Sequence, residues 1–241
     1  MEMPVDVQHQ AMGYDRTATM FSPEGKLLQV EYGEKAVRLG NSSIGMVCSD
    51  GVFILADKRI HDILIAPKSA SKIYEIDEHI IASSAGIVSD GRILMEKAQL
   101  LAQQHRVTYD SEIEPEVIIR ELSNIKQQFT QYGGARPFGV SILLAGINGK
   151  KPELFTSDIT GNYASYLANA IGENDSVIKD KLKDRYSQKS TIKQGVKLAL
   201  SIFKELKGKE FEIDKFELVY IDKDKGKLKR IEGEELKDYS K

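Results

Sequence analysis

Cysteine is scarce in this chain of 241 residues. Cys48 is the only one, which excludes an internal disulfide and a cysteine-rich zinc module. Long apolar runs are missing as well, because stretches such as residues 52–56 are far shorter than the roughly 18 residues of a transmembrane helix. Basic residues show no excess, since 34 Lys and Arg stand against 36 Asp and Glu. We therefore expect neither a membrane span nor a nucleic-acid partner.

A secretory signal is also missing from the start of the sequence. The first ten residues, MEMPVDVQHQ, contain neither a basic segment nor an apolar one. We therefore expect a cytoplasmic protein, in keeping with the single cysteine. Hydrophobic residues make up 41% of the chain and charged residues 29%, so the chain can bury a sizeable core as globular domains do.

Residues typical of metal and phosphate sites are present, but their spacing is wrong. No recognised ligand spacing is shared by the four histidines, His9, His61, His79 and His105. Gly40 and Gly45 are spaced like the glycines of a P-loop. However, Met46 and Val47 stand where that loop needs Lys and Ser or Thr. We therefore expect no metal site and no cofactor.

Hydrophobic periodicity divides the chain into alternating groups of strands and helices. The expected helices cover residues 22–39, 89–105, 115–129, 175–184 and 191–206. The expected strands cover residues 44–48, 52–56, 72–76, 79–84, 139–147, 154–157, 162–171, 216–221 and 228–231. Hairpins of strands joined by pairs of helices predict an α+β fold, with two antiparallel sheets stacked face to face and helices on both outer sides.

The chain is expected to form one domain, because no linker rich in Pro, Gly or Ser interrupts residues 14–241. Residues 1–13 are polar and without a period, which predicts a flexible arm. The segment Ser22-Pro23-Glu24-Gly25 indicates either a turn or the start of the first helix, with Ser22 at the N-cap. That helix carries two apolar stripes, which indicates two packing partners: Leu27, Val30 and Val37 form one, and Leu28, Tyr32 and Leu39 the other.

Two segments of the sequence are distinctive. Residues 14–37 read YDRTATMFSPEGKLLQVEYGEKAV, and residues 131–141 read QYGGARPFGVS. Both resemble motifs of proteasome α-type subunits, the first nearly residue for residue, and the order of strands and helices fits that family over almost the whole chain. The resemblance implies the four-layer αββα sandwich of N-terminal-nucleophile hydrolases, which the hydrophobic pattern predicts independently.

The resemblance does not imply catalysis by this chain. The β-type subunits of the family carry a processed N-terminal Thr, whose hydroxyl and free amine act as nucleophile and base. The matching position here is Asn41, which has no hydroxyl and follows 40 other residues. Asp57, Arg59 and Lys72 match the charged partners of that threonine. The chain is therefore expected to be a non-catalytic component of a threonine-type endopeptidase complex.

The resemblance implies instead that the chain builds part of a ring and controls entry into it. Such subunits form seven-membered rings that cap the rings of β subunits and admit only unfolded protein chains. Residues 1–13 would be the gate across the axial pore. The cluster that holds the gate open would be Tyr14, Asp15, Pro23 and Tyr32. The annulus that narrows the pore would be Tyr132, Gly133, Gly134 and Ala135.

A docking pocket for a regulatory AAA ATPase is implied as well. Lys72 matches the family's pocket lysine, which accepts the C-terminal carboxylate of the activator, and the pocket wall would include Gly86, Ile87 and Glu31. Two positions depart from the family pattern: Gly33 stands where Ala is usual, and Asn41 where a small hydroxyl residue is common. We expect a ring of one kind of α subunit, of the archaeal type, because the chain lacks long insertions.

Two other hypotheses stay open. An active hydrolase of the β type would use Ser42 or Ser43 after cleavage of the chain in front of it, and would lose about 40 residues of mass. A small-molecule enzyme that shares the sandwich by convergence would be a monomer or a dimer. The mass of the mature chain and its oligomeric state distinguish these hypotheses from a ring subunit.

Overall fold

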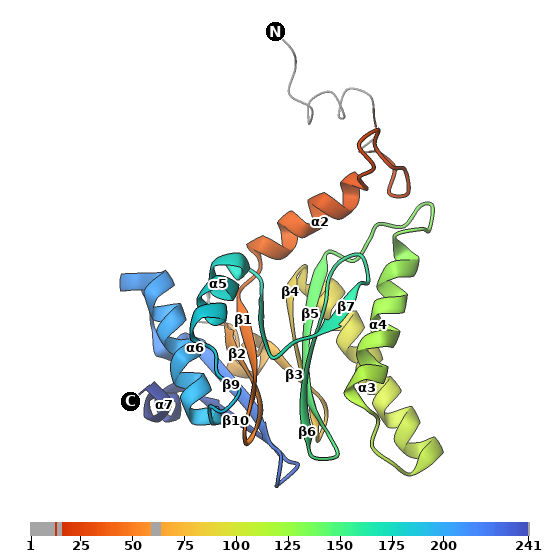
Figure 1. Ribbon diagram of the computed structural model, residues 1–241. Helices are drawn as coiled ribbons and strands as arrows, with labels where there is room; N and C mark the ends of the chain where they lie inside the picture. Colours follow the sequence, from red (N-terminus) through yellow and green to blue (C-terminus); the bar gives the residue numbers. More distant parts are fainter. Residues whose placement is uncertain (1–12, 14–15, 59–63, 241) are drawn as a thin grey trace.

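Two five-stranded antiparallel sheets lie face to face in the computed structural model, with helices on both outer faces (Figure 1). The structure describes residues 13, 16–58 and 64–240. The first sheet has the strand order β10-β9-β2-β1-β8 and the second the order β3-β4-β5-β6-β7. This arrangement confirms the predicted four-layer αββα sandwich with an N-terminal helix.

The strands of each sheet come from distant parts of the chain. The first sheet consists of β1 (Ser43–Cys48), β2 (Gly51–Asp57), β8 (Ala168–Ile171), β9 (Phe216–Asp222) and β10 (Leu228–Glu232). The second consists of β3 (Ile73–Asp77), β4 (Ile80–Gly86), β5 (Val140–Asn148), β6 (Lys151–Ser157) and β7 (Tyr163–Ser165).

Helices cover the two outer faces and one end of the sandwich (Figure 1). The second sheet is covered by α3 (Val88–Tyr109) and α4 (Pro115–Phe129). The first is covered by α5 (Asp175–Arg185) and α6 (Ile192–Lys207), with the short α7 (Lys237–Ser240) against α6. Helix α2 (Leu28–Leu39) lies across one end. Short 3₁₀ turns are η2 (Pro67–Ala70), η3 (Gly208–Glu210), η4 (Ile213–Lys215) and η5 (Gly233–Leu236).

Strand β2 shows why the sequence produces these layers. All of its residues are buried, and its sequence at residues 52–56 is continuously apolar rather than alternating between apolar and polar residues. Its side chains still alternate in direction, because successive residues of a strand point to opposite faces. Val52 and Ile54 belong to the core between the sheets, whereas Phe53 and Leu55 pack into the core under α6.

Helix α2 contributes to the core between the sheets through one of its two predicted stripes. Val30 and Val37 are buried there, with Leu27 packed against them, so the first stripe is confirmed. The second stripe is mixed: Leu28 is buried, whereas the Leu39 side chain is 81% exposed. An apolar side chain this exposed at the end of a helix leaves surface that a second protein could cover.

The predicted start of α2 at residue 22 is wrong, and the turn alternative holds. The helix begins at Leu28, and residues 22–26 form a tight turn closed by the hydrogen bond from the Ser22 N–H to the Lys26 carbonyl at 2.8 Å. Gly25 has φ +75°, a conformation that favours glycine, and a bridge joins Phe21 to Leu27. The chain therefore doubles back before it enters the helix.

The expected single strand over residues 162–171 is also wrong. The chain forms β7 in the second sheet and β8 in the first, and residues 166–167 cross between the sheets. The Tyr166 N–H donates to the Leu154 carbonyl and the Val47 N–H to the Leu167 carbonyl, both at 2.8 Å. The crossing therefore satisfies backbone groups of both sheets, and hydrophobic pattern alone cannot reveal it.

None of the helices that the structure describes is long and apolar enough to cross a membrane.

Candidate functional site

A cavity of about 360 Å³ lies where the C-terminus of α2 meets the ends of several strands. Its walls come from the end of α2 and the link to β1, from the residue after β2, from η2 and β3, and from the junction of β4 with α3. The residues that line it are Leu39, Gly40, Asn41, Lys58, Ser69, Ala70, Ser71, Lys72, Tyr74, Ser84, Ala85, Gly86 and Val88. We call this the Lys72 pocket.

The structure brings together two of the four residues predicted for the docking pocket. Lys72 and Gly86 both line the cavity, whereas Ile87 and Glu31 are not among its lining residues. Glu31 lies in the first turn of α2, where its carboxylate pairs with Lys26 at 3.2 Å. Ile87 immediately precedes α3 and is half-buried. The roles of these four residues stay predictions.

Glycines allow the backbone segments around the pocket to approach closely. A Cβ atom on Gly86 would lie 2.1 Å from the carbonyl oxygen of Gly139, and Gly86 has φ +122°, which L-residues rarely adopt. A Cβ atom on Gly40 would lie 2.4 Å from the Gly86 nitrogen. The link between α2 and β1 therefore rests directly on the end of β4, next to Lys72.

Lys72 stands at the start of β3, and its side chain reaches toward the start of β1. Its ammonium donates to the backbone carbonyl of Asn41. A second cation, Lys58, also lines the pocket and pairs with Glu232 at 2.6 Å. An ammonium at the wall of such a cavity suits a carboxylate or another small anion.

The hydroxyl groups of the two residues after Asn41 form hydrogen bonds within the chain. Ser42 donates to the Glu173 carbonyl at 2.6 Å, and the Ser43 hydroxyl lies 2.8 Å from that of Ser83. Both residues are buried, and each hydroxyl has a partner within the chain.

The structure describes two of the three charged residues that were predicted to surround a nucleophile. Asp57 is fully buried and pairs with Lys207 of α6. Lys72 contacts the Asn41 carbonyl, as described above. Arg59 lies outside the residues that the structure describes.

The predicted pore annulus lies in the exposed loop between α4 and β5. Tyr132 is 61% exposed, and both Gly133 and Gly134 would have open space around an added Cβ atom. This loop and the turn before α2 lie at the same end of the molecule (Figure 1).

The base of the annulus loop is fixed to the start of α3. Arg136 donates two hydrogen bonds to the Asp90 carboxylate, at 2.6 and 2.8 Å, and the Gly139 N–H donates a third at 2.9 Å. Burial alone would raise the pKa of Asp90, but these hydrogen bonds and the Arg136 charge outweigh it and hold the pKa below its ordinary value. The pKa of Arg136 is raised by the same partner.

The structure describes two of the four residues of the predicted gate cluster. Pro23 is exposed in the turn before α2, and Tyr32 is half-buried on α2 with the Lys35 ammonium 5.3 Å from its ring centre. Tyr14 and Asp15 lie outside the described residues, as does the arm at residues 1–12. The cluster stays a prediction.

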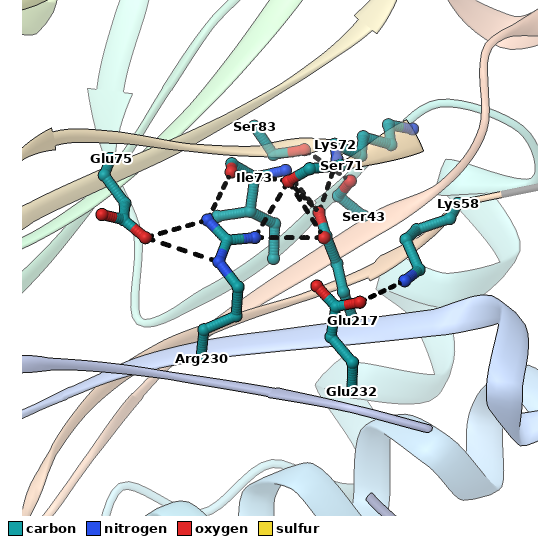
Figure 2. A network of polar contacts seen from close by, with 10 residues as sticks. All are labelled: Ser43, Lys58, Ser71, Lys72, Ile73, Glu75, Ser83, Glu217, Arg230 and Glu232. Atoms are coloured by element: carbon teal, nitrogen blue, oxygen red, sulfur yellow. Dashed lines mark hydrogen bonds and ion pairs between the residues drawn. The ribbon is translucent and has the colours of Figure 1, made fainter. Parts of the chain in front are cut away.

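One residue that sequence reasoning missed is Glu217, which lies in β9 and holds the segment that carries Lys72 (Figure 2). A signal was present in the sequence, because a carboxylate within the mostly apolar strand Phe216–Ile221 must find partners when the strand is buried. Which partners it finds depends on the contact between the two sheets, and the sequence does not reveal that contact.

Metal binding has no support in the described part of the chain. Within residues 16–58 and 64–240, no three His, Cys, Asp or Glu side chains gather in a way that could hold an ion. His79 is buried in the core, with its Nε2 atom 2.8 Å from the Ile113 carbonyl.

The sequence is similar to known proteins along nearly the whole chain. The family model described as "Proteasome subunit" matches residues 37–221, and the model that describes the N-terminal signature of the A-type proteasome subunits matches residues 14–36. The chain is 41% identical to the proteasome alpha subunit of Methanococcus maripaludis (strain C5) over 218 residues, which cover 90% of this chain and 83% of that protein.

Two further relatives extend the similarity. The proteasome alpha subunit of Methanothermobacter thermautotrophicus is 38% identical over 231 residues, which cover 95% of this chain and 93% of that protein. The proteasome alpha subunit of Thermococcus sibiricus is 39% identical over 224 residues, which cover 93% and 85%. Because the two models together match residues 14–221 and the relatives align with most of the sequence, the chain belongs to the proteasome α-subunit family.

Proposed function

We propose that this chain is a non-catalytic subunit of the outer ring of a 20S proteasome core, where it controls the passage of unfolded proteins to the catalytic β subunits. The observation that carries the proposal is the environment of Asn41. By resemblance Asn41 matches the position of the nucleophile, and its amide side chain has no hydroxyl. The position follows directly after α2. The neighbouring Ser42 and Ser43 hydroxyls are both engaged in hydrogen bonds within the chain.

The Lys72 pocket is proposed to receive the C-terminal carboxylate of a regulatory ATPase. Lys72 supplies the cation and Gly86 a wall without a side chain, while Ile87 and Glu31 stay part of the proposed site. A charge-assisted hydrogen bond of this kind contributes about 1.5–3 kcal/mol. Several tails that bind one ring together would gain further through effective concentration. The exposed Leu39 and Val88 side chains at the pocket rim provide apolar surface that a neighbour in the ring could cover.

The gate and the pore are proposed to lie at the end of the molecule that carries the annulus loop. Residues 1–13 would close the pore, and Tyr14, Asp15, Pro23 and Tyr32 would hold the arm in its open position. Tyr132, Gly133, Gly134 and Ala135 would form the constriction. The exposure of the 132–134 loop and its firm base at Arg136 support this role, because a pore constriction needs a fixed loop that does not fold back on its own subunit.

The purified chain tests the proposal first. We expect an intact mass of 26.9 kDa, assembly into a ring of about 190 kDa for seven copies, and no peptide hydrolysis without β subunits. Loss of about 40 N-terminal residues with turnover by the chain alone would support the β-type hydrolase instead. A monomer or dimer in light scattering would support the unrelated small-molecule enzyme.

Replacement of Lys72 tests the docking site. We expect Lys72→Ala to leave ring assembly intact and to abolish the stimulation of peptide hydrolysis by the ATPase, because the carboxylate loses its cation. Lys189→Ala, at an exposed lysine on the loop before α6, serves as the matched control. Unchanged stimulation of the Lys72→Ala particle would remove Lys72 from the site.

A further inference from the structure

Glu217 is a completely enclosed carboxylate next to the Lys72 pocket. Its side chain has no exposed surface, and it pairs in register with Ala56 of β2 and Glu232 of β10. Burial raises the pKa of Glu217, although backbone N–H groups and Arg230 oppose the shift. A carboxylate at such a position is destabilising unless hydrogen bonds satisfy both of its oxygens.

The partners of Glu217 come from three consecutive residues around Lys72 (Figure 2). One carboxylate oxygen, Oε1, accepts hydrogen bonds from the Lys72 and Ile73 N–H groups, both at 2.5 Å. The other oxygen, Oε2, accepts the Ser71 hydroxyl at 3.1 Å. A strand of the first sheet therefore holds the beginning of β3 in the second sheet at the residue that carries the ammonium.

Arg230 of β10 binds the same segment from the other side (Figure 2), and we call the contacts of Glu217 and Arg230 with residues 71–73 the clamp. Its guanidinium pairs with Glu217 at 3.1 Å and donates to the Ser71 hydroxyl and the Ile73 carbonyl, both at 2.9 Å. It also pairs with Glu75 at 3.1 Å, where the carboxylate is half-exposed. Donors and acceptors of residues 71–73 are thus bound on both sides, while the Lys72 side chain extends toward Asn41.

We propose that Glu217, with Arg230, is the positioning residue of the Lys72 pocket and fixes the direction in which the Lys72 ammonium is presented. The inference rests on the proposed docking role of Lys72. A lysine side chain has many rotamers, so its affinity for a carboxylate depends on how much freedom it loses on binding. Glu217 fixes the backbone from which this side chain starts, so the backbone adds no further loss of freedom on binding.

Charge and positioning predict opposite effects when Glu217 changes. Loss of a negative charge near Lys72 would by itself strengthen the binding of a carboxylate. Loss of the clamp would weaken it. In Glu217→Gln the neutral amide accepts hydrogen bonds more weakly than a carboxylate, and its NH₂ group would face the Arg230 donor. In Glu217→Asp the charge is kept, but the carboxylate is one methylene further from the Lys72 and Ile73 N–H groups.

The test uses full-length chains assembled with the β subunits of the same organism. The probe is a synthetic peptide of the last eight residues of the partner ATPase, with a free C-terminal carboxylate, and the same peptide amidated gives the baseline. We measure the peptide concentration that gives half-maximal stimulation of hydrolysis, and the maximal rate. For both Glu217→Gln and Glu217→Asp we expect that concentration to rise about three- to tenfold, with the same maximal rate. The control Glu78→Gln, at an exposed carboxylate in the turn between β3 and β4, should match the wild type.

The outcomes distinguish this inference from the proposed function. If Lys72→Ala leaves stimulation unchanged, the docking role itself is wrong. If Lys72→Ala abolishes stimulation while both Glu217 variants match the wild type, the docking role stands and the positioning role is overturned. Tighter binding by Glu217→Gln alone would assign Glu217 an electrostatic effect and also overturn positioning.

A second variant covers the case in which Glu217 is needed for folding. Arg230 is partly exposed, with 27% of its side-chain surface accessible, so Arg230→Gln should assemble. It removes the donors to Ser71 and Ile73, and we expect it to raise the half-maximal concentration as well. An assembled Arg230→Gln particle with the wild-type value would contradict the clamp.

Discussion

Lys126 is a buried lysine whose pKa shift makes stability depend on pH. It lies on α4 with no exposed surface, and its ammonium nitrogen is 3.2 Å from both the carbonyl and the hydroxyl oxygen of Ser157. Burial lowers its pKa from 10.5 to about 7, although the charge of Asp158 opposes the shift. The lysine therefore joins α4 to the end of β6. Because of its lowered pKa, it loses its proton, and so its charge, near neutral pH.

This shift predicts how stability changes with pH. Between pH 7 and 10.5 the unfolded chain keeps the Lys126 proton while the folded chain releases it, so the free energy of unfolding rises with pH over this window. The slope from this group is about 1.4 kcal/mol per pH unit, and the penalty, fully present below pH 7, is roughly 5 kcal/mol per chain.

The substitution Lys126→Met tests this reasoning, because Met has a similar length and cannot carry a charge. We expect the variant to be more stable than the wild type at pH 6, by up to a few kcal/mol, with the advantage shrinking steadily toward pH 9.5. Thermal and urea unfolding across that range measure the difference, and Lys189→Met controls for the loss of an exposed charge. Parallel stability profiles of the Lys126→Met variant and the wild type would refute the account of Lys126.

Two more predictions concern Asp90 and Gly86, which hold the backbone around the site. Asp90→Asn should lower the melting temperature by a few degrees and loosen the annulus loop, because Arg136 loses the charge of its partner. In the wild type, the stabilisation by Asp90 should also fade as the pH falls through the lowered pKa of Asp90. Identical acid unfolding profiles of the variant and the wild type would contradict this role of Asp90. Gly86→Ala should destabilise the chain by about 2 kcal/mol or more, since an added Cβ would meet the Gly139 carbonyl at 2.1 Å and the φ of +122° suits only glycine. A melting temperature within one degree of the wild type would show that the backbone can move aside.

Much of the fold is predictable from local pattern. The Asn148-Gly149 turn predicts the hairpin of β5 and β6, and the structure has it between residues 148 and 151. The apolar run of β2 predicts a strand buried on both faces, which is the property that creates layers. Both signals act over a few neighbouring residues, so a single sequence contains them.

What could not be predicted depends on contacts between distant segments. The crossing at residues 166–167 needs open edges in both sheets, and the partners of Glu217 need the first sheet to approach the start of β3. The pairing of Asp57 with Lys207 joins residues 150 positions apart. Sequence periodicity indicates that such charged groups are buried but not which groups they meet.

The central claim is that this chain controls passage into a chamber where other subunits do the cutting. Hydrolysis of a short fluorogenic peptide, by the full-length chain assembled with β subunits and by the same particle lacking residues 1–12, tests that claim most directly. The account predicts several-fold faster hydrolysis by the shortened particle, with the same number of active sites, and no hydrolysis by either form of the chain alone. Equal rates for the two particles, or turnover by the isolated chain, would contradict it.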